Sequence, residues 1–532
     1  MSRRKPVSQE EAKTKVVSIN PATMEVIGEM PLSTPDDVKK AINAAQGAFS
    51  GWANLGVSAR ARYMLRARDY ILDHMDEVSR TISMDTGKPL EESLNAEVMV
   101  VVDLLTQYSK RAVKLLEPDP IALTNPIIRL TKTSQLVYQP LGVVSVISPW
   151  NYPFSLAMSG LIFALLAGNT VVFKPSTEVA VVGKKIEEIF LKGAVLPAGV
   201  FNMVVAAGSS VGTALFEPPI KKIVFTGSTS VGKWIQQKAA LNFIPTVMEL
   251  GGKDPMLVLD DADLEMASSG AVWGAFTNCG QVCSSVERVY VARSIYSRFV
   301  EMVKRKTSRL RLGSGLDFGV DTGPMISMDQ LGVVEAQMLD AIEKGASVVT
   351  GGKRPANLNG YFYEPTVLTD VNHSMKVMTD ETFGPLMPIM AFDAEEEAIA
   401  MANDSIYGLT ASVWTRDRRH AEAIARRIQS GTVTVNDHAY TYGLTETPWQ
   451  GMKESGTGVS HSDRGLLEFV YPQHIHLDRS PAMVKRRLWW YPYSQEAYEI
   501  QKMATEAFAR SAKLPKFLAN AFLNGKYRKT LF

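Results

Sequence analysis

Two cysteines lie four residues apart in the stretch FTNCGQVCSS, which runs from Phe276 to Ser285, and the chain has no others. A thiolate is a nucleophile and a metal ligand, whereas a buried thiol packs like a small apolar group. Two cysteines cannot build a disulfide framework, and no zinc-type ligand spacing accompanies Cys279 and Cys283, so we expect no metal site. Nucleophilic chemistry and packing remain as the two alternatives.

Short apolar runs of strand type recur from Gly142 onward, with helical segments between most of them. Alternating buried strands and helices predict an α/β fold with a parallel, doubly wound sheet, which binds ligands at the carboxyl ends of its strands. Four polar stretches follow such runs and are therefore expected at one ligand-binding edge. They are SPWNYPF (148–154), FKPSTE (173–178), FTGSTSVG (225–232) and MELGGKDP (248–255).

Further elements lie outside this first sheet. A second cycle of strand and helix patterns begins near Ala271 and predicts a second α/β domain, while residues 58–113 have helical periodicity. The stretches TKTSQLVY (131–138) and HIHLD (474–478) alternate polar and apolar residues like exposed strands, which could pair into an arm that joins subunits.

An uncharged run from Pro153 to Phe173 is long enough to span a bilayer. The turn signal Gly168-Asn169-Thr170 divides it into two shorter pieces. We therefore expect a buried helix followed by a short strand, with no membrane span.

This set of motifs resembles the aldehyde dehydrogenase superfamily, in its NAD(P)-dependent, non-acylating form. The match includes ETFGPLMP (381–388) and PWQGMKESGTG (448–458), in the order that the family shows, and it covers roughly Ser18 to Gln473. The resemblance implies a Rossmann-like cofactor domain and an α/β catalytic domain, both doubly wound parallel-sheet domains, with a small β oligomerisation arm. We assign residues 1–121 and 141–250 to the cofactor domain, 251–465 to the catalytic domain, 122–140 and 466–480 to the arm, and 481–532 to a tail.

The resemblance also implies the catalytic residues. Cys283 matches the family's nucleophile, which would add to the aldehyde and become a thioester. Asn151 matches the side-chain donor to the oxyanion, beside the backbone N–H of Cys283. Glu249 matches the general base that activates water for deacylation. For Cys279 we favour packing over a resolving thiol that protects Cys283.

The cofactor contacts follow from the same resemblance. Gly227, Ser228 and Gly232 precede a helix whose N-terminus could meet the pyrophosphate, and Lys174 matches a contact to the adenosine ribose. Many NAD-using members have Glu where this chain has Thr177, so we expect NAD or NADP, with NADP use favoured by the missing carboxylate. Trp150, Glu381 and Phe383 are expected to hold the nicotinamide end.

Less is indicated about the substrate. Tyr152 and Trp449 are expected to line its tunnel, and the small Ser155 and Ser159 suggest room for a medium-chain, long-chain or aromatic aldehyde. Two alternatives stay open: an enzyme that passes the acyl group to coenzyme A, and a catalytically retired binding protein of the same fold.

The charge and composition of the chain limit the kinds of partner that we expect. The 532 residues carry a net charge of +2, which gives no general attraction to nucleic acid. From Pro481 onward ten basic and three acidic residues make a tail of +7, which leaves −5 for the remainder. Its aromatic and apolar residues suit a peripheral contact with an anionic membrane. We expect a cytoplasmic homodimer or homotetramer that acts on a small-molecule aldehyde.

Overall fold

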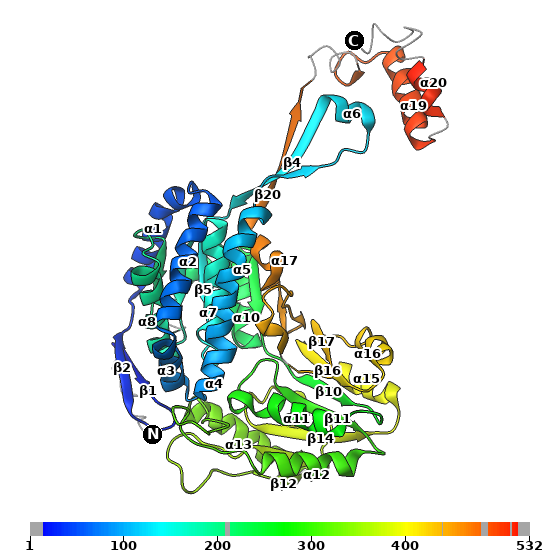
Figure 1. The fold of residues 1–532 in the computed structure, drawn as a ribbon. Coiled ribbons are helices and arrows are strands. Elements are labelled where there is room, and N and C mark those ends of the chain that lie inside the picture. The colour runs from blue at the N-terminus through cyan, green and yellow to red at the C-terminus, as the bar shows by residue number, and fades with distance from the viewer. Residues whose placement is uncertain (1–13, 208–212, 439, 480–487, 511–512, 520–532) are drawn as a thin grey trace, which may run out of the picture. The chain divides into compact units, whose positions relative to one another are not determined.

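The computed structural model of the chain describes residues 14–207, 213–438, 440–479, 488–510 and 513–519. It divides into two compact units (Figure 1). The first combines the chain up to Leu115 with Pro140–Val470, and the second combines Leu116–Gln139 with the chain from Tyr471 onward. Parts of the predicted tail, 481–487 and 520–532, lie outside the described residues, as do residues 1–13 of the predicted cofactor domain.

The first unit contains a six-stranded sheet with the order β19-β9-β8-β5-β6-β7. Its strands are β5 (Val143–Ile147), β6 (Thr170–Lys174), β7 (Phe201–Met203), β8 (Ile220–Thr226), β9 (Thr246–Glu249) and β19 (Gly456–Thr457). Every pair is parallel except β19 with β9. All five residues of β5 are buried, which explains why this strand has apolar residues on both of its faces.

A seven-stranded sheet with the order β12-β13-β14-β11-β10-β16-β17 follows in the same unit. Its strands are β10 (Asp254–Val258), β11 (Val286–Ala292), β12 (Ser347–Thr350), β13 (Thr366–Thr369), β14 (Leu386–Phe392), β16 (Thr410–Trp414) and β17 (Thr432–Val435). Only β12 pairs antiparallel within this sheet. The predicted α/β class and the two sheets are confirmed. The domain boundaries stay a prediction. Strand β19 joins the first sheet although its residues lie within the range 251–465 that we assigned to the catalytic domain.

Helices cover both sheets. Figure 1 shows α2, α5 and α7 side by side next to β5. On the first sheet the main helices are α1 (Pro35–Ala53), α2 (Val57–Asp73), α3 (Met75–Thr86), α4 (Leu90–Ser93), α5 (Met99–Leu115), α7 (Ser155–Ala167), α8 (Ala180–Glu188) and α10 (Thr229–Ala240). On the second they are α11 (Leu264–Phe276), α12 (Tyr296–Thr307), α13 (Met328–Glu343), α15 (Glu395–Asn403) and α16 (Arg418–Ala425).

The uncharged run 153–173 is a buried helix and a strand, as predicted. Every residue of α7 except Leu156 is buried, and the helix ends at Gly168, whose φ of 97° is the left-handed conformation that glycine adopts without strain. Strand β6 starts two residues later. Across the described part of the chain, no helix is both long enough and apolar enough to cross a membrane.

The second unit contains a three-stranded sheet, β20-β4-β3, and the helices α6 (Pro126–Thr131), α19 (Gln495–Ala509) and α20 (Leu514–Leu518). The strands are β3 (Asp119–Ile121), β4 (Lys132–Pro140) and β20 (Val470–Asp478). The predicted exposed strands therefore pair with each other. Lys132 forms an ion pair with Asp478 at 2.7 Å, and Gln139 Nε2 donates to Gln473 Oε1, which sets the two strands antiparallel.

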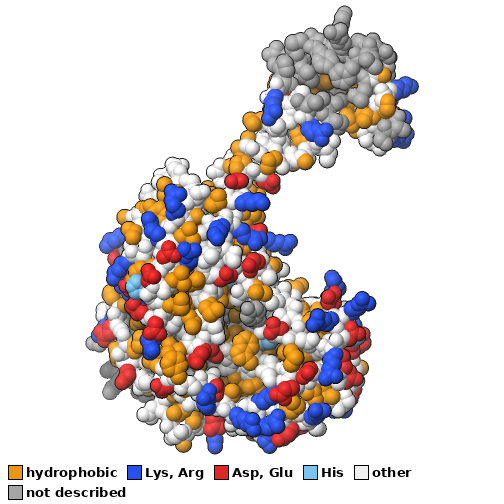
Figure 2. Space-filling model, in the orientation of Figure 1, with side chains coloured by type: hydrophobic (Ala, Val, Ile, Leu, Met, Phe, Trp, Pro, Cys, Tyr) orange, Lys and Arg blue, Asp and Glu red, His pale blue; other side chains and the backbone are white. Residues whose placement is uncertain are grey.

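The surface of the first unit carries both signs of charge. Lys and Arg side chains alternate with Asp and Glu over the face shown in Figure 2, without a continuous basic field. Such a mixed surface does not attract a polyanion in particular.

Candidate active site

Cys283 lies between two cavities of the first unit, in the loop that leads into β11. It lines one cavity of about 230 Å³ and another of about 240 Å³, and its side chain is half-buried. A molecule in either cavity can therefore reach the same sulfur atom.

The first cavity gathers most of the residues predicted for chemistry and cofactor binding. Its lining includes Trp150, Asn151, Gly227, Ser228, Glu249, Cys283, Glu381 and Phe383. They come from the carboxyl ends of β5, β8 and β9 and from two loops of the other sheet, which is the ligand-binding edge that the strand pattern predicted. The rings of Trp150 and Phe383 meet edge to face at 5.2 Å on one wall.

Glu249 is the last residue of β9 and is buried. Its Oε1 accepts a hydrogen bond from Ser460 Oγ at 2.8 Å, while Oε2 has no partner among the described residues. Burial raises the pKa of Glu249 to about 8, against the hydrogen bond from Ser460, which lowers it. A carboxyl group with this pKa is mainly protonated at neutral pH, so it can act as a general base only in its ionised fraction, which grows as the pH rises.

Two glycines after Glu249 allow loops to approach closely. A Cβ on Gly251 would lie 2.4 Å from Glu381 Oε2, and a Cβ on Gly252 would lie 2.3 Å from the carbonyl oxygen of Cys283. Gly252 N–H also donates to Glu381 Oε1 at 3.1 Å. Any side chain at these positions would push Glu381 and Cys283 away from Glu249.

Burial favours the protonated form of the Cys283 thiol. Burial, and then the negative charges of Asp254, Glu249 and Glu381, raise its pKa well above the ordinary value. The thiol must therefore lose its proton when it reacts. Glu249 lines the same cavity as Cys283 and so lies where the later hydrolysis needs a base.

Cys279 has the surroundings of a packing residue. It is 1% exposed, its Sγ lies 3.6 Å from Met325 Sδ, and burial raises its pKa to about 12. This supports packing over the role of a resolving thiol.

Asn151 is held by the loop that carries Cys283 and by a lysine that no motif indicated. Its Nδ2 donates to the carbonyl of Gln281 at 3.1 Å, in the loop that carries Cys283. Its own carbonyl accepts from Lys88 Nζ at 2.6 Å and from Asn278 Nδ2 at 3.1 Å. Lys88 in turn forms an ion pair with Glu97 at 2.6 Å, and both side chains are fully buried.

Glu97 completes this support, since its Oε2 accepts from the backbone N–H groups of Phe154 and Ser155. The pair thus fixes the segment that follows Asn151. Lys88 and Asn151 are 63 positions apart in the chain, so only the fold brings them together. No sequence signal could have identified Lys88 as a support for Asn151.

The second cavity is mostly apolar. Its walls include Val100, Tyr152, Leu156, Trp273, Val282, Tyr442 and Trp449. The predicted Tyr152 and Trp449 thus lie in one cavity with Cys283. The prediction for Ser155 and Ser159 is wrong: Leu156 faces this cavity, whereas Ser159 borders a much smaller space of about 20 Å³ beside Glu249.

Three predicted cofactor residues do not line the first cavity: Lys174, Thr177 and Gly232. Lys174 ends β6, and burial lowers its pKa to about 8. Thr177 begins a 3₁₀ turn next to it and is half-buried. Gly232 lies in the first turn of α10, where a Cβ would come within 2.4 Å of Leu250, so its role in the structure is helix packing.

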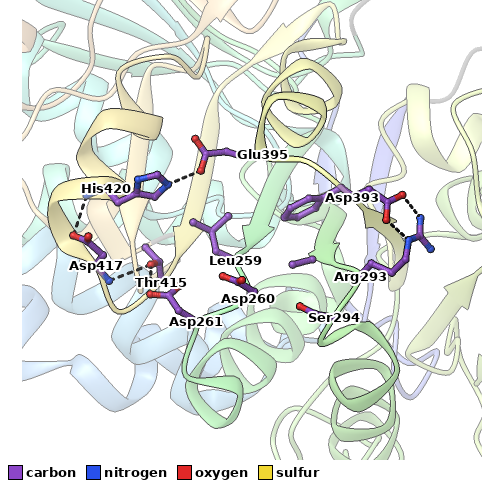
Figure 3. A pocket seen from close by; sticks show the side chains of 12 residues that line it. Leu259, Asp260, Asp261, Arg293, Ser294, Asp393, Glu395, Thr415, Asp417 and His420 are labelled. Atoms are coloured by element: carbon purple, nitrogen blue, oxygen red, sulfur yellow. Dashed lines mark hydrogen bonds and ion pairs between the residues drawn. The ribbon is translucent and has the colours of Figure 1, made fainter.

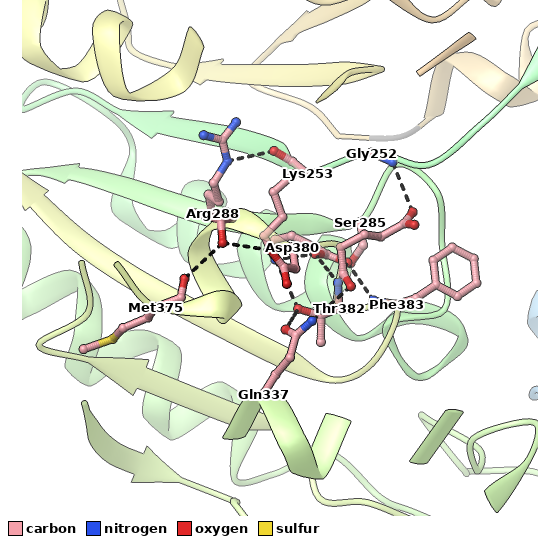
Figure 4. Close-up of polar contacts among 12 residues, drawn as sticks. Gly252, Lys253, Ser285, Arg288, Gln337, Met375, Asp380, Thr382 and Phe383 are labelled. Atoms are coloured by element: carbon pink, nitrogen blue, oxygen red, sulfur yellow. Dashed lines mark hydrogen bonds and ion pairs between the residues drawn. The ribbon is translucent and has the colours of Figure 1, made fainter. Parts of the chain in front are cut away.

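Lys253 follows the two glycines of MELGGKDP and supports another part of the site. Lys253 is fully buried and forms an ion pair with Glu287 at 2.6 Å (Figure 4). Glu287 also accepts from the backbone N–H groups of Thr382 and Phe383. This network therefore positions the segment that carries Glu381 and Phe383.

A larger cavity of about 540 Å³ lies at the carboxyl ends of strands in the second sheet (Figure 3). Its polar side chains already bind one another: Arg293 pairs with Asp393, His420 with Glu395, and Thr415 with Asp261. None of the predicted site residues lines it. Size alone therefore does not mark the reactive site.

Comparison with known proteins agrees with this geometry. The profile described as "Aldehyde dehydrogenase family" matches residues 7–475. The chain is 39% identical over 486 residues to 4,4'-diapolycopene aldehyde oxidase from Methylomonas sp, which covers 91% of this chain and 90% of that protein. It is 37% identical to a putative succinate-semialdehyde dehydrogenase (NADP+) from Mycolicibacterium smegmatis, over 89% of this chain and 92% of the relative. The structure of betaine aldehyde dehydrogenase from Staphylococcus aureus in complex with NAD+ aligns with a TM-score of 0.84 at 34% identity, covering 91% of this chain and 95% of that one.

Proposed function

The chain belongs to the aldehyde dehydrogenase family, and we propose that it oxidises an aldehyde to its carboxylic acid with NAD or NADP as hydride acceptor. One observation carries the proposal: Cys283 forms part of the wall of two separate cavities, and the polar one also contains Glu249 and Asn151. This arrangement suits a nucleophile that binds an aldehyde from one side, so that the carbon of the adduct can give up a hydride toward the other side.

The residues of the polar cavity fit a dinucleotide. Ser228 precedes the first turn of α10, whose N-terminal N–H groups suit a pyrophosphate, and Lys174 is a largely desolvated ammonium near the same sheet edge. Trp150, Glu381 and Phe383 would hold the nicotinamide end beside Cys283. When bound, an oxidised nicotinamide ring supplies an acceptor for hydride.

The first half of the reaction is the attack of Cys283 Sγ on the aldehyde carbon, in which the C–S bond forms, the carbonyl π bond breaks and the thiol proton passes to water. The carbonyl oxygen becomes an oxyanion, and Asn151 Nδ2 would turn from the carbonyl of Gln281 to donate to it. Collapse of this adduct restores the C=O bond as the hydride leaves carbon, and a thioester on Cys283 remains.

The second half is hydrolysis of that thioester. Glu249 takes a proton from water as the water oxygen attacks the acyl carbon, and the C–S bond then breaks. The departing thiolate takes up a proton, which Glu249 can return, so the products are the carboxylic acid and the free thiol. One aldehyde, one water and one oxidised dinucleotide are consumed in each turnover.

We propose a medium-chain, long-chain or aromatic aldehyde as the substrate class. The support is the apolar wall made by Val100, Leu156, Trp273 and Tyr442 together with the predicted Tyr152 and Trp449. The relative from Methylomonas is named for an aldehyde of diapolycopene, whereas the one from Mycolicibacterium is named for a semialdehyde.

For the cofactor we propose dual use, with NADP well accepted. Thr177 offers no carboxylate against a 2′-phosphate, and the neighbouring Glu178 is exposed. Thr177→Glu should lower the ratio of kcat/KM for NADP to that for NAD by about tenfold or more, because it adds a negative charge beside the phosphate. A strong preference of the wild type for NAD would contradict dual use.

The deciding experiment measures NAD(P)H formation with a panel of aldehydes of increasing chain length and with both cofactors. Formation of acid and NAD(P)H in equal amounts is expected, with kcat/KM rising with chain length. The same reactions with coenzyme A test the acyl-transferring alternative by the appearance of acyl-coenzyme A. Absence of turnover with every aldehyde would favour the retired binding protein.

We also propose that the enzyme works in the cytoplasm as a homodimer or homotetramer, with a peripheral membrane contact through residues 481–532. The support for a reducing compartment is that both Cys279 and Cys283 are free thiols. The support for an oligomer is the sheet β20-β4-β3, whose edge strand β20 exposes Tyr471 and Leu477 by 51% and 53%.

A further inference from the structure

An aromatic cluster lies at the start of the described part of the C-terminal tail. Its members are Trp489, Trp490, Tyr491, Tyr493 and Tyr498, which are 54%, 54%, 79%, 73% and 63% exposed. Five large aromatic side chains within ten residues form a concentrated apolar surface, which differs from the scattered exposed apolar residues of ordinary surfaces. The cluster also lies beyond residues 7–475, the part that matches the family profile.

The backbone of this aromatic cluster has a defined structure. Leu488, Ala497 and Ile500 form a small buried core beneath it, and Gln501 Nε2 donates to the carbonyl of Leu488. Helix α19 starts after Ser494, whose side chain accepts from Ala497 N–H at 3.1 Å. The apolar face of α19 is thereby used inside the second unit, and the aromatic residues remain on the outside.

Tyr498 and Lys502 place an aromatic ring and a positive charge on the same exposed face of α19. They are four residues apart, about one helical turn, and both are exposed. The rings of Tyr491 and Tyr493 lie 4.7 Å apart and extend the aromatic surface before the helix. Aromatic and basic groups thus share one surface.

We propose that this aromatic cluster binds the headgroup region of an anionic lipid bilayer. Trp and Tyr favour that region because their rings are apolar while their N–H and O–H groups remain hydrated. The net charge of +7 that the sequence carries from Pro481 onward attracts anionic lipids. This inference rests on the proposed function, because a membrane is where apolar aldehydes for the Cys283 cavity accumulate.

The charge also argues against a second copy of the cluster as the partner. Two tails of +7 would repel each other, and Trp and Tyr carry polar groups that a dry contact between copies would have to satisfy. A lipid headgroup region removes both the charge repulsion and the loss of hydrogen bonds, since it supplies negative charge to the basic residues and water to the polar groups of Trp and Tyr.

Co-sedimentation of the full chain with vesicles tests the proposal. One set of vesicles contains phosphatidylcholine alone, and the other contains phosphatidylcholine with phosphatidylglycerol. Wild type should sediment with the anionic vesicles, and high salt should reduce the bound fraction. Trp489→Ala/Tyr491→Ala should weaken partitioning about tenfold or more, and Lys502→Glu about fivefold.

Phe243→Ala is the matched control, because Phe243 is an aromatic residue of the first unit that is 94% exposed. It should bind vesicles like the wild type. Equal sedimentation of all variants, or no binding by the wild type, overturns the proposal. A change in oligomeric mass of Trp489→Ala/Tyr491→Ala without lipid would instead assign the aromatic cluster to a contact between copies.

Activity on a short, water-soluble aldehyde separates this inference from the proposed function. Trp489→Ala/Tyr491→Ala and Lys502→Glu should retain that activity, which also shows that they fold. If the wild type binds vesicles but oxidises no aldehyde, the proposed function fails while the membrane contact stands. If it oxidises aldehydes but ignores vesicles, only the inference of this subsection fails.

Discussion

Glu249 and Cys283 line one cavity, and each must be in its deprotonated form at a different step of the reaction. The thiol must lose its proton as it attacks, and Glu249 must be ionised when water attacks the thioester. Burial raises the pKa of both groups, so neither is permanently charged near neutral pH. Proton transfer is therefore coupled to chemistry instead of being complete beforehand.

Substitution of Glu249 by Gln should separate the two halves of the reaction. Glu249→Gln leaves Cys283 able to form the thioester but removes the base, so steady-state turnover should fall about 10²–10⁴-fold. Stopped-flow absorbance should then show a burst of NAD(P)H close to one per site, and intact mass spectrometry should show acylated enzyme.

Two comparisons make the result specific. Cys283→Ala should show no burst, since no thioester forms. Glu422→Gln, an exposed glutamate on α16, should behave as wild type. A Glu249→Gln enzyme with normal turnover would mean that another group activates water.

The pH dependence should report Glu249 when hydrolysis limits the rate. Activity should rise with pH through about 8, because Glu249 acts as a base only when ionised. Ser460→Ala removes a hydrogen bond that favours the ionised form, so this limb should move to higher pH. A limb that stays in place or moves to lower pH would exclude this role of Ser460.

The sequence allowed a better prediction of the residues that react than of the residues that surround them. Cys283, Glu249 and Asn151 were predicted because they stand in motifs that resemble a family. Ser155 and Ser159 were misplaced because successive residues of a helix point about 100° apart, so that Leu156 faces the tunnel instead. The burial of Lys253 could not be predicted, because a lysine has no local signal for a buried partner such as Glu287, 34 positions away.

At the scale of elements, buried ion pairs support the loops that carry the chemistry. Lys88 and Glu97 connect the helical segment after α3 to the loop of Asn151, and Lys253 and Glu287 support the loop of Glu381. Strands and helices followed from hydrophobic patterns, whereas these pairs join segments far apart in sequence. They could not be predicted without the sheet order.

Lys88→Met should destabilise the protein and impair catalysis together. Glu97 would keep a buried charge without its partner, which costs about 3–5 kcal/mol. The carbonyl of Asn151 would also lose a donor, so kcat should fall more than the KM for the cofactor changes. Thermal unfolding and steady-state kinetics measure the two effects.

The matched control is Arg293→Met, which removes an ion pair whose side chains are 62% and 65% exposed. That pair should contribute about 1 kcal/mol or less. The double variant Lys88→Met/Glu97→Gln should recover part of the lost stability, because no unpaired charge remains. Equal losses for Lys88→Met and Arg293→Met would show that the buried pair has no special role.

At the scale of the whole molecule, the second unit combines a small sheet with the tail. The edge strand β20 exposes Tyr471 and Leu477, and an open edge with apolar residues suits pairing with another copy. Alternation in the sequence predicted the strands, but it could not predict which edge stays open. The pairing of β4 with both β3 and β20 decides that.

Negative charges introduced on the exposed edge of β20 should disrupt the proposed homo-oligomer. Tyr471→Asp/Leu477→Asp should lower the molar mass measured by light scattering, because a dry contact would have to bury two carboxylates. Phe318→Asp, at a residue of the first unit that is 79% exposed, should leave the mass unchanged. A monomeric wild type, or an unchanged mass for the double variant, would remove the arm from subunit contact.

The place of Glu249 among the cavities has a consequence for timing. Its carboxylate borders the polar cavity and does not line the apolar one, so a hydrolytic water can reach it from the space assigned to the dinucleotide. An acylated sulfur atom is thus sheltered from premature hydrolysis for as long as that space is filled. Emptying of the polar cavity would thereby determine when the C–S bond of the thioester is hydrolysed.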